Sequence, residues 1–149
     1  MGDPVIATNL TVRAMEPDDI THVMEIDRMS GGSRAITYQG QIDFFLGGEL
    51  GLSYVAEQDG KVVGFLMGRI LERRYAPYMG AWVEIMGVVP DLKRMGIGHR
   101  LLEAFLEGCR QHGIQEVHAV ASKRDTEVKP FLECYGFSQG ELVHLHKQL

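Results

Sequence analysis

Residues 93–99, Lys-Arg-Met-Gly-Ile-Gly-His, bring two glycines and three basic side chains together. The apolar run before them stops at Pro90, which has no N–H to donate to a sheet, and apolar residues at helical spacing follow as far as Gly113. Glycine lets a ligand approach the backbone, and the N–H groups at a helix N-terminus attract anions. The pattern predicts a strand, a short loop and a helix, in which the loop is either a phosphate-binding site or an ordinary exposed turn.

Two common phosphate-binding loops are excluded by the residues around Gly98. A Walker loop ends in Gly-Lys-Ser/Thr, whereas Gly98 is followed by His99 and Arg100. A dinucleotide-binding fingerprint needs a small residue at position 101, which is Leu101. The loop therefore belongs to neither of these nucleotide-binding families.

Composition limits the class of protein. The 149 residues, of which 45% are hydrophobic, suffice for one folded domain, so we expect a single domain over residues 1–149. A formal net charge of −5 does not favour nucleic acid as a partner. Cys109 and Cys134 fall in apolar, helix-like patterns and are expected to be reduced core residues of a cytoplasmic protein. No apolar run approaches the roughly 20 residues of a membrane span and no secretory signal is recognised, so a membrane partner is not expected.

Hydrophobic periodicity predicts the order of the elements. Alternating, β-rich stretches predict strands at residues 9–14, 52–57, 61–71, 82–89, 116–121 and 140–149. Helical spacing predicts helices at residues 17–28, 38–46, 97–112 and 128–135. Asp59-Gly60, between two of the strands, predicts a tight hairpin turn because such a turn needs positive φ.

Two stretches of the sequence resemble signatures of the GNAT acetyltransferase superfamily. The main signature is a strand ending in Val-x-Pro, then Gln/Arg-x-x-Gly-x-Gly/Ala at the start of a helix; residues 88–90 and 93–98 match it, with Lys93 in place of Gln or Arg. The second is an aromatic-rich helix ending in Gly-Phe, which residues 131–137 match. The resemblance covers nearly the whole chain. It implies an α/β (α+β) GNAT fold: a central, mixed, mostly antiparallel twisted sheet with a splayed central strand pair and flanking helices.

The resemblance also implies a reaction, the transfer of an acetyl group from acetyl-CoA to an acceptor amine by direct attack. In such proteins a bulge splays the central strand and pantetheine adds beside it like an extra strand; Gly87 is compatible with this bulge. By position, the backbones of Met86 and Val88 would face pantetheine and the thioester carbonyl. The cofactor-binding residues implied are Met86, Gly87, Val88, Lys93, Arg94, Met95, Gly96, Ile97, Gly98 and His99.

Glu84 is the expected general base. An amine with a pKa of ~10 is mostly protonated at neutral pH, so a base must remove a proton before the nitrogen attacks. Glu84 is the one charge in the apolar stretch 82–89, where many GNAT proteins place a Glu and where a buried charge is costly without a purpose. We expect it to be buried, which would strengthen it as a base. The alternative is a structural glutamate that is paired or faces outward.

The general acid is where the sequence departs from the family pattern. The position that often holds Tyr is Leu132, which cannot donate a proton, and Val120 stands where some members carry a base. Tyr78 and Tyr135 are candidate substitutes, but a CoA thiolate, with a pKa of roughly 8.5, can leave without an acid. His, Cys and carboxylate residues show no metal-ligand spacing, so no metal site is expected.

The sequence leaves the acceptor and the oligomeric state open. Negative charge suits polyamines, aminoglycosides or basic protein tails, whereas the tyrosines of the 72–80 connection suit a peptide N-terminus. The short segment after Phe137 has room for one good strand, so an open sheet edge could recruit a second copy as a homodimer. A second functional class also fits: a non-catalytic GNAT-fold module that binds acyl-CoA as a sensor or regulator.

Overall fold

The computed structural model describes residues 9–29, 52–72, 79–119, 126–141 and 145–149, together with the single residues 121, 123 and 143. The chain groups into two compact units, Met1–Ala119 and Val120–Leu149. The helix predicted at residues 38–46 and the tyrosines of the 72–80 connection lie outside the described residues.

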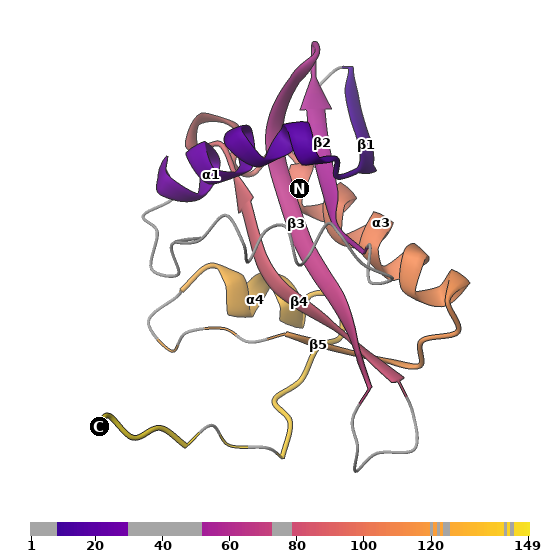
Figure 1. Ribbon diagram of the computed structural model, residues 1–149, viewed down its shortest axis with the longest axis vertical. Coiled ribbons are helices and arrows are strands. Elements are labelled where there is room, and N and C mark those ends of the chain that lie inside the picture. The colour runs from indigo at the N-terminus through magenta and orange to yellow at the C-terminus, as the bar shows by residue number, and fades with distance from the viewer. Residues whose placement is uncertain are drawn as a thin grey trace. The chain divides into compact units, whose positions relative to one another are not determined.

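The described part of the first unit is built on a mixed sheet with the strand order β1-β2-β3-β4-β5 (Figure 1). β1 to β4 are antiparallel neighbours, and β4 pairs with β5 in parallel, which confirms the predicted mixed, mostly antiparallel sheet. The strands are β1 Leu10–Ala14, β2 Tyr54–Gln58, β3 Lys61–Glu72, β4 Met79–Val88 and β5 Glu116–Ala119. The helices are the 3-10 helices η1 Pro17–Asp19 and η2 Pro90–Leu92 and the α-helices α1 Ile20–Met29, α3 Ile97–Gln111 and α4 Val128–Glu133.

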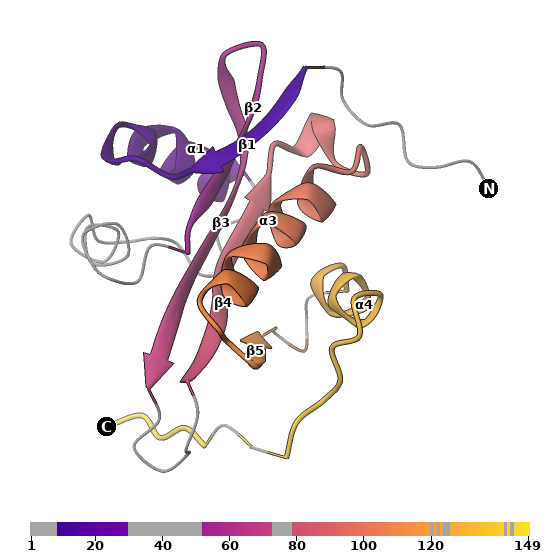
Figure 2. The ribbon, with the colours of Figure 1, turned by 90° about the vertical axis from the view of Figure 1, so that its right-hand side faces the viewer.

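Helices cover both faces of this sheet. Figure 2 shows α1 on one face and α3 on the other. On the α1 side, Ile26 belongs to the same buried cluster as Phe65 and Met67 of β3. Because side chains alternate along a strand, the odd-numbered residues of β3 from Gly64 onward face α1 and the even-numbered ones face α3.

Two glycines let α3 lie close to the sheet. A Cβ at Gly68 of β3 would lie 2.4 Å from Phe105 Cε2, and a Cβ at Gly108 of α3 would lie 2.3 Å from the Tyr54 hydroxyl. Both separations are far shorter than a van der Waals contact, so a side chain at either position would displace the helix. The α3 side of the sheet therefore depends on these two glycines.

Backbone geometry confirms two turns that the sequence predicts. Asp59 and Gly60 have φ values of 51° and 79°, as a two-residue hairpin turn between β2 and β3 requires. Gly113 has a φ of 70°, and its N–H and that of the next residue donate to carbonyls of the last helical turn at 3.0 and 2.9 Å. This arrangement ends α3 at the predicted position.

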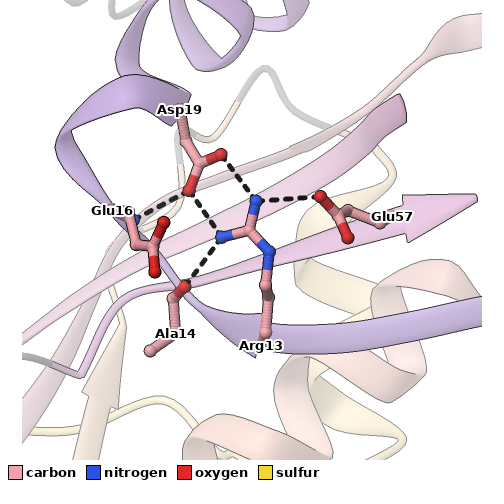
Figure 3. Close-up of polar contacts among 5 residues, drawn as sticks. All are labelled: Arg13, Ala14, Glu16, Asp19 and Glu57. Carbon is pink, nitrogen blue, oxygen red and sulfur yellow. Dashed lines mark hydrogen bonds and ion pairs between the residues drawn. The ribbon is translucent and has the colours of Figure 1, made fainter. Parts of the chain in front are cut away.

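A charged cluster ties β1 to η1 and β2 (Figure 3). The Arg13 guanidinium donates to both carboxylate oxygens of Asp19 at 2.7 Å, to Glu57 at 2.9 Å and to Ala14 O at 3.0 Å. Asp19 also accepts the N–H of Glu16 at 2.8 Å. The hydrogen bonds from Arg13 lower the pKa of Asp19, and the bonds to both carboxylates raise the pKa of Arg13. The cluster fixes the entry to α1 against the first strand.

In the second unit, α4 is confirmed and the predicted last strand is not. Gly136 has a φ of 86°, and its N–H and that of Phe137 donate to carbonyls one turn earlier at 3.0 and 3.2 Å, which ends the helix. The described residues of the range 140–149 form no strand, and Val143 and Leu145 are exposed. Alternation predicts a strand only where a neighbour pairs with it, and no described residue does so here.

The two cysteines differ in exposure. Cys109, on α3, is buried, and its burial raises the pKa of the thiol to about 11. Cys134, just after α4, is exposed. The prediction of two core cysteines is right for Cys109 and wrong for Cys134, because helical spacing does not say how the residue at the end of a short helix is covered.

Candidate functional site

The central strand carries a bulge at Glu84. β3 and β4 pair Met67 with Ile85 and Gly68 with Val83, so Glu84 stands opposite no residue of β3 in the described sheet. An inserted residue of this kind shifts the alternation of the strand by one position. The side chains after Glu84 therefore point to the opposite side of the sheet from the one that the alternation before Glu84 would predict.

The bulge expected at Gly87 lies instead at Glu84. Gly87 is in regular register with Phe65, and a Cβ at this position would lie 2.8 Å from Phe65 Cε1 and 3.6 Å from Ile26 Cγ2. The Phe65 ring is fully buried. Gly87 therefore leaves room for this ring, and a packing requirement explains the glycine better than a bulge does.

Glu84 forms an ion pair with Arg69 of β3. Arg69 Nε donates to Glu84 Oε1 at 2.8 Å, and 29% and 28% of the respective side chains remain exposed. Glu84 is therefore less buried than expected. The reason is that the bulge directs its carboxylate over the neighbouring strand toward a cation. Among the described residues, no group donates a hydrogen bond to Glu84 Oε2.

Aromatic rings lie on the same side of the sheet as this ion pair. Trp82 is in register with Arg69, and the rings of Trp82 and His118 stack with their centroids 4.6 Å apart and their planes 20° apart. His118 Nε2 lies 3.4 Å from Glu116 Oε1. Register partners share one side of a sheet, so Arg69, Trp82 and His118 lie on the same side, and the ion pair with Arg69 brings Glu84 to it as well. We call these four residues the bulge-side cluster.

Sequence reasoning found one member of the bulge-side cluster and missed three. Trp82 stands two positions before Glu84, and the period of a strand is a signal that could have placed both side chains on one face. Arg69 and His118 lie in neighbouring strands, and their positions depend on the register of β3 and β5 with β4, which the sequence does not show.

Pairing between β4 and β5 stops beside the bulge. It covers Gly80–Val83 of β4 and Glu116–Ala119 of β5. Beyond Val83, no described residue pairs with β4 on its β5 side, whereas the pairing with β3 continues to Val88. We call Ile85–Val88 the post-bulge segment.

The hydrogen-bond pattern shows which way the post-bulge segment directs its backbone. Val89 N–H donates to Val63 O of β3 at 2.9 Å. In an antiparallel pair, residues alternate between bonding to the neighbouring strand and pointing away from it. Counting back from Val89, the N–H and C=O groups of Met86 and Val88 point away from β3, toward the side that β5 has left.

The chain then enters α3 through a turn with two positive φ values, 66° at Arg94 and 83° at Gly96. Gly96 is the N-cap, no side chain caps the helix, and its first turn holds no acidic residue. The first helical hydrogen bond runs from Arg100 N–H to Gly96 O at 3.1 Å, so the amides of Ile97 and Gly98 precede the helical ladder. Such an N-terminus carries a positive potential that suits an anion.

Basic side chains surround this turn in solvent. Lys93, Arg94 and His99 are exposed. Arg100 is half-buried, and its Nη1 donates to Leu10 O of β1 at 2.8 Å, which links α3 to the edge of the sheet. The three exposed side chains give the surface of the turn a basic character, which suits an anion.

The middle of the turn faces the interior. Gly96 and Ile97 are buried, and Met95 and Gly98 are half-buried. Their side chains, where present, belong to the packing of α3 against the sheet. Contact with a ligand at these four positions would therefore come from the backbone.

The positions considered for a general acid supply none in the described residues. Leu132 is buried and has no proton to donate. Tyr135 is half-buried, and its ring lies tilted against Phe131 at 5.5 Å between centroids. Tyr78 and Val120 lie outside the described residues.

The described part of the chain shows neither a metal-binding cluster nor a membrane-spanning helix. No group of three or more His, Cys, Asp or Glu residues among the described ones could hold a metal ion. None of the described helices is both long and apolar enough to cross a bilayer.

Comparison with known proteins identifies the family in which a bulged central strand is followed by a glycine turn and a helix. The model of the acetyltransferase (GNAT) family matches residues 20–137. This chain belongs to the GNAT family. GNAT acetyltransferases are acyltransferases, so the prediction of an acyltransferase enzyme is confirmed. Among curated protein sequences, none is significantly similar to this GNAT chain.

Solved structures of acetyltransferases share the fold. An aminoglycoside acetyltransferase from an uncultured soil metagenomic sample, meta-AAC0020, has a TM-score of 0.75 at 21% identity, over 95% of this chain and 97% of its own. Aminoglycoside N-acetyltransferase AAC(6')-Iy, in complex with CoA, has a TM-score of 0.77 at 19% identity, over 93% and 94%. Ard1 from Thermoplasma volcanium has a TM-score of 0.76 at 27% identity, over 88% and 84%. These similarities confirm the GNAT fold predicted from the motifs.

Proposed function

We propose that this GNAT chain transfers an acetyl group from acetyl-CoA to an acceptor amine by direct attack of the nitrogen. The observation that carries the proposal is the order of three features along one stretch of chain: the carboxylate at the bulge, the post-bulge segment and the N-terminus of α3. The reaction needs a base, backbone groups for the thioester arm and a site for the diphosphate. The three features would supply these in that order.

The diphosphate of acetyl-CoA would bind at the turn before α3. The backbone amides there precede the helical ladder, no acidic side chain opposes the helix dipole, and exposed basic side chains surround the turn. The residues assigned to this contact are Lys93, Arg94, Met95, Gly96, Ile97, Gly98 and His99. Lys93, Arg94 and His99 would act through their side chains and the others through their backbone.

The pantetheine arm would lie along the post-bulge segment. Met86 and Val88 direct their backbone groups to the side that β5 has left, where an extended amide chain can bond to them as a strand would. One of these N–H groups would also bond to the thioester oxygen as it gains charge. Gly87 lies between them and serves the site by admitting the Phe65 ring beneath it.

Glu84 would act as the base. An acceptor ammonium gives one proton to the carboxylate, directly or through a water, and the neutral nitrogen attacks the carbonyl carbon of the thioester. A C–N bond forms, the C–S bond breaks and CoA leaves as a thiolate. The second proton leaves the nitrogen as the amide forms and restores the thiol. No general acid is needed, since a thiol pKa of roughly 8.5 makes the thiolate a good leaving group.

The acceptor is proposed only as a class, a primary or secondary amine. The names of two structural relatives identify aminoglycosides as acceptors of those proteins. In this chain, Arg69 balances the charge of Glu84 and the adjoining surface is aromatic, so the described part of the site is not the strongly acidic surface that a polycation would favour. An acceptor panel should therefore contain peptides and small monoamines beside aminoglycosides and polyamines.

The test is an acetyl-transfer assay on such a panel, with free thiol and product mass as the readouts. We expect one amine class to release CoA thiol and to gain one acetyl group. Glu84→Gln should lower kcat by about 100-fold or more while the Kd for acetyl-CoA stays within about twofold. Glu107→Gln, in an exposed ion pair on α3, is the matched control and should be fully active. Unchanged turnover in Glu84→Gln would remove this residue from the mechanism.

A further inference from the structure

Arg69 donates a hydrogen bond to one of the two carboxylate oxygens of Glu84, the proposed base. The bond from Arg69 Nε reaches Glu84 Oε1 at 2.8 Å, and among the described residues no hydrogen bond reaches Oε2. Arginine–carboxylate pairs are frequently bidentate, with both oxygens engaged. Here the second oxygen stays available to another proton donor.

The bulge explains why such a partner is needed. Glu84 is the inserted residue of β4 and stands opposite no residue of β3 in the described sheet, so register pairing does not hold its side chain. A glutamate has several freely rotating bonds, and ordering it costs conformational entropy. Arg69 lies on the neighbouring strand, in register with Trp82, and reaches across to supply the missing constraint.

We propose that Arg69 is a positioning residue that holds Glu84 Oε1 and so presents Oε2 to the proton of the acceptor amine. This inference rests on the proposed function, in which Glu84 is the base. Arg69 belongs to β3, outside the strand–turn–helix stretch that carries the family motif. Its proposed effect on the reaction is exerted through its hydrogen bond to Glu84.

The pair is well suited to a kinetic test because its loss should not unfold the protein. Both side chains are more than a quarter exposed, and ion pairs of this kind contribute little to folding. Arg69→Met keeps the length of the side chain and removes its charge and donors. Arg69→Lys keeps a charge that can still reach one oxygen, although without the planar geometry of arginine.

The experiment is a double-mutant cycle in the acetyl-transfer assay, with Arg69→Met, Glu84→Gln and the double variant. We expect Arg69→Met alone to lower kcat by about 10- to 100-fold, the effect of losing one charge-assisted hydrogen bond, with the KM for acetyl-CoA within about twofold. In the Glu84→Gln background, Arg69→Met should change kcat by less than about twofold, because its effect needs the carboxylate. Arg69→Lys should recover part of the lost rate.

Arg110→Met is the matched control, since it removes an arginine from an exposed ion pair on α3 and should leave kcat unchanged. Thermal unfolding verifies that every variant is folded. An equal loss of rate from Arg69→Met in both backgrounds, or activity equal to or above that of the wild type, overturns the inference and leaves the proposed function standing. Full activity in Glu84→Gln, or no turnover by the wild type, contradicts the proposed function and the inference with it.

Discussion

At the scale of single residues, the chemistry assigned to this chain depends on one inserted position. Strict alternation along residues 82–89 would place Glu84, Met86 and Val88 on one face of the sheet. The structure places Glu84 with Arg69 on the α1 side, whereas Met86 is in register with Leu66, an even-numbered residue on the α3 side. The bulge thus puts the carboxylate of Glu84 and the side chain of Met86 on opposite sides of the sheet.

The candidate base could be found from the sequence, but its surroundings could not. A lone charge in an apolar strand is visible in the residues themselves, and it identified Glu84. The partly exposed pairing with Arg69 depends on strand register and on the bulge, and a sequence with regular alternation contains no signal for either. For the same reason the sequence suggests a bulge at Gly87. In the structure, this glycine instead leaves room for the Phe65 ring.

The cysteines provide a prediction at this scale. Burial raises the pKa of Cys109 to about 11, so at pH 8 about one thiol in a thousand is ionised, and it is also shielded from reagents. Cys134 is exposed. We expect a thiol reagent to modify Cys134 within seconds to minutes and Cys109 only after denaturant is added. Cys134→Ser serves as the control and should show no rapid phase; a rapid phase of two thiols in the wild type would contradict the burial of Cys109.

At the scale of elements, the turns and ends of elements follow from local chemistry. Asp59 and Gly60 adopt the positive φ values that the hairpin needs, and Gly113 and Gly136 end their helices in the left-handed region. Such features could be predicted because a residue and its neighbours determine them. The prediction of a strand at 140–149 is wrong, because a strand also needs a partner strand, and the residues of the segment itself do not determine one.

The charged cluster of Figure 3 gives a prediction for β1, η1 and β2. Asp19 is buried, and the hydrogen bonds from Arg13 hold its pKa below its ordinary value. Its ionised form therefore stabilises the fold above an unfolded-state pKa of about 3.9, and this contribution disappears as the pH falls through the lower folded-state pKa. Asp19→Asn should lower the free energy of unfolding at pH 7 by about 1–3 kcal/mol.

Urea unfolding of Asp19→Asn and the wild type at pH 7 and pH 3 measures this contribution. The difference in free energy of unfolding should shrink at pH 3, because this pH lies below the unfolded-state pKa of about 3.9 and the unfolded carboxyl then binds a proton that the folded one, with its lowered pKa, binds less readily. Glu107→Gln, on the exposed surface of α3, is the control and should match the wild type at pH 7. A difference for Asp19→Asn that stays constant between the two pH values would show that the ion pair is not its source.

At the scale of the whole molecule, the described sheet and its helices arrange three chemical features along one path. In Figure 2, α1 and α3 cover opposite faces of the sheet, so the edge that β4 exposes beyond the bulge is left to backbone contacts. The chain leaves that edge at Val88 and begins α3 at Ile97, so strand and helix N-terminus are successive parts of one unit. A ligand with an anionic end and an extended amide arm matches this order.

The fold at this scale was the most predictable feature, because a short family motif carries it. Residues 88–98 and 131–137 pointed to the GNAT family, which the family model and the solved structures confirm. The acceptor was not predictable, because acceptor contacts come from loops and neighbouring strands whose side chains the motif does not specify. Arg69 and His118 belong to this second group.

The most direct test of the account is a crystal structure of the protein with bound CoA. We predict that the diphosphate accepts hydrogen bonds, at about 3 Å, from the amides at the start of α3 around Gly96 and Gly98, and that pantetheine bonds to the backbone of Met86 and Val88. The thiol should then lie next to the bulge of β4 at Glu84. CoA bound elsewhere, or a diphosphate that makes no contact with these amides, would contradict the assignment of acyl transfer to this strand and helix.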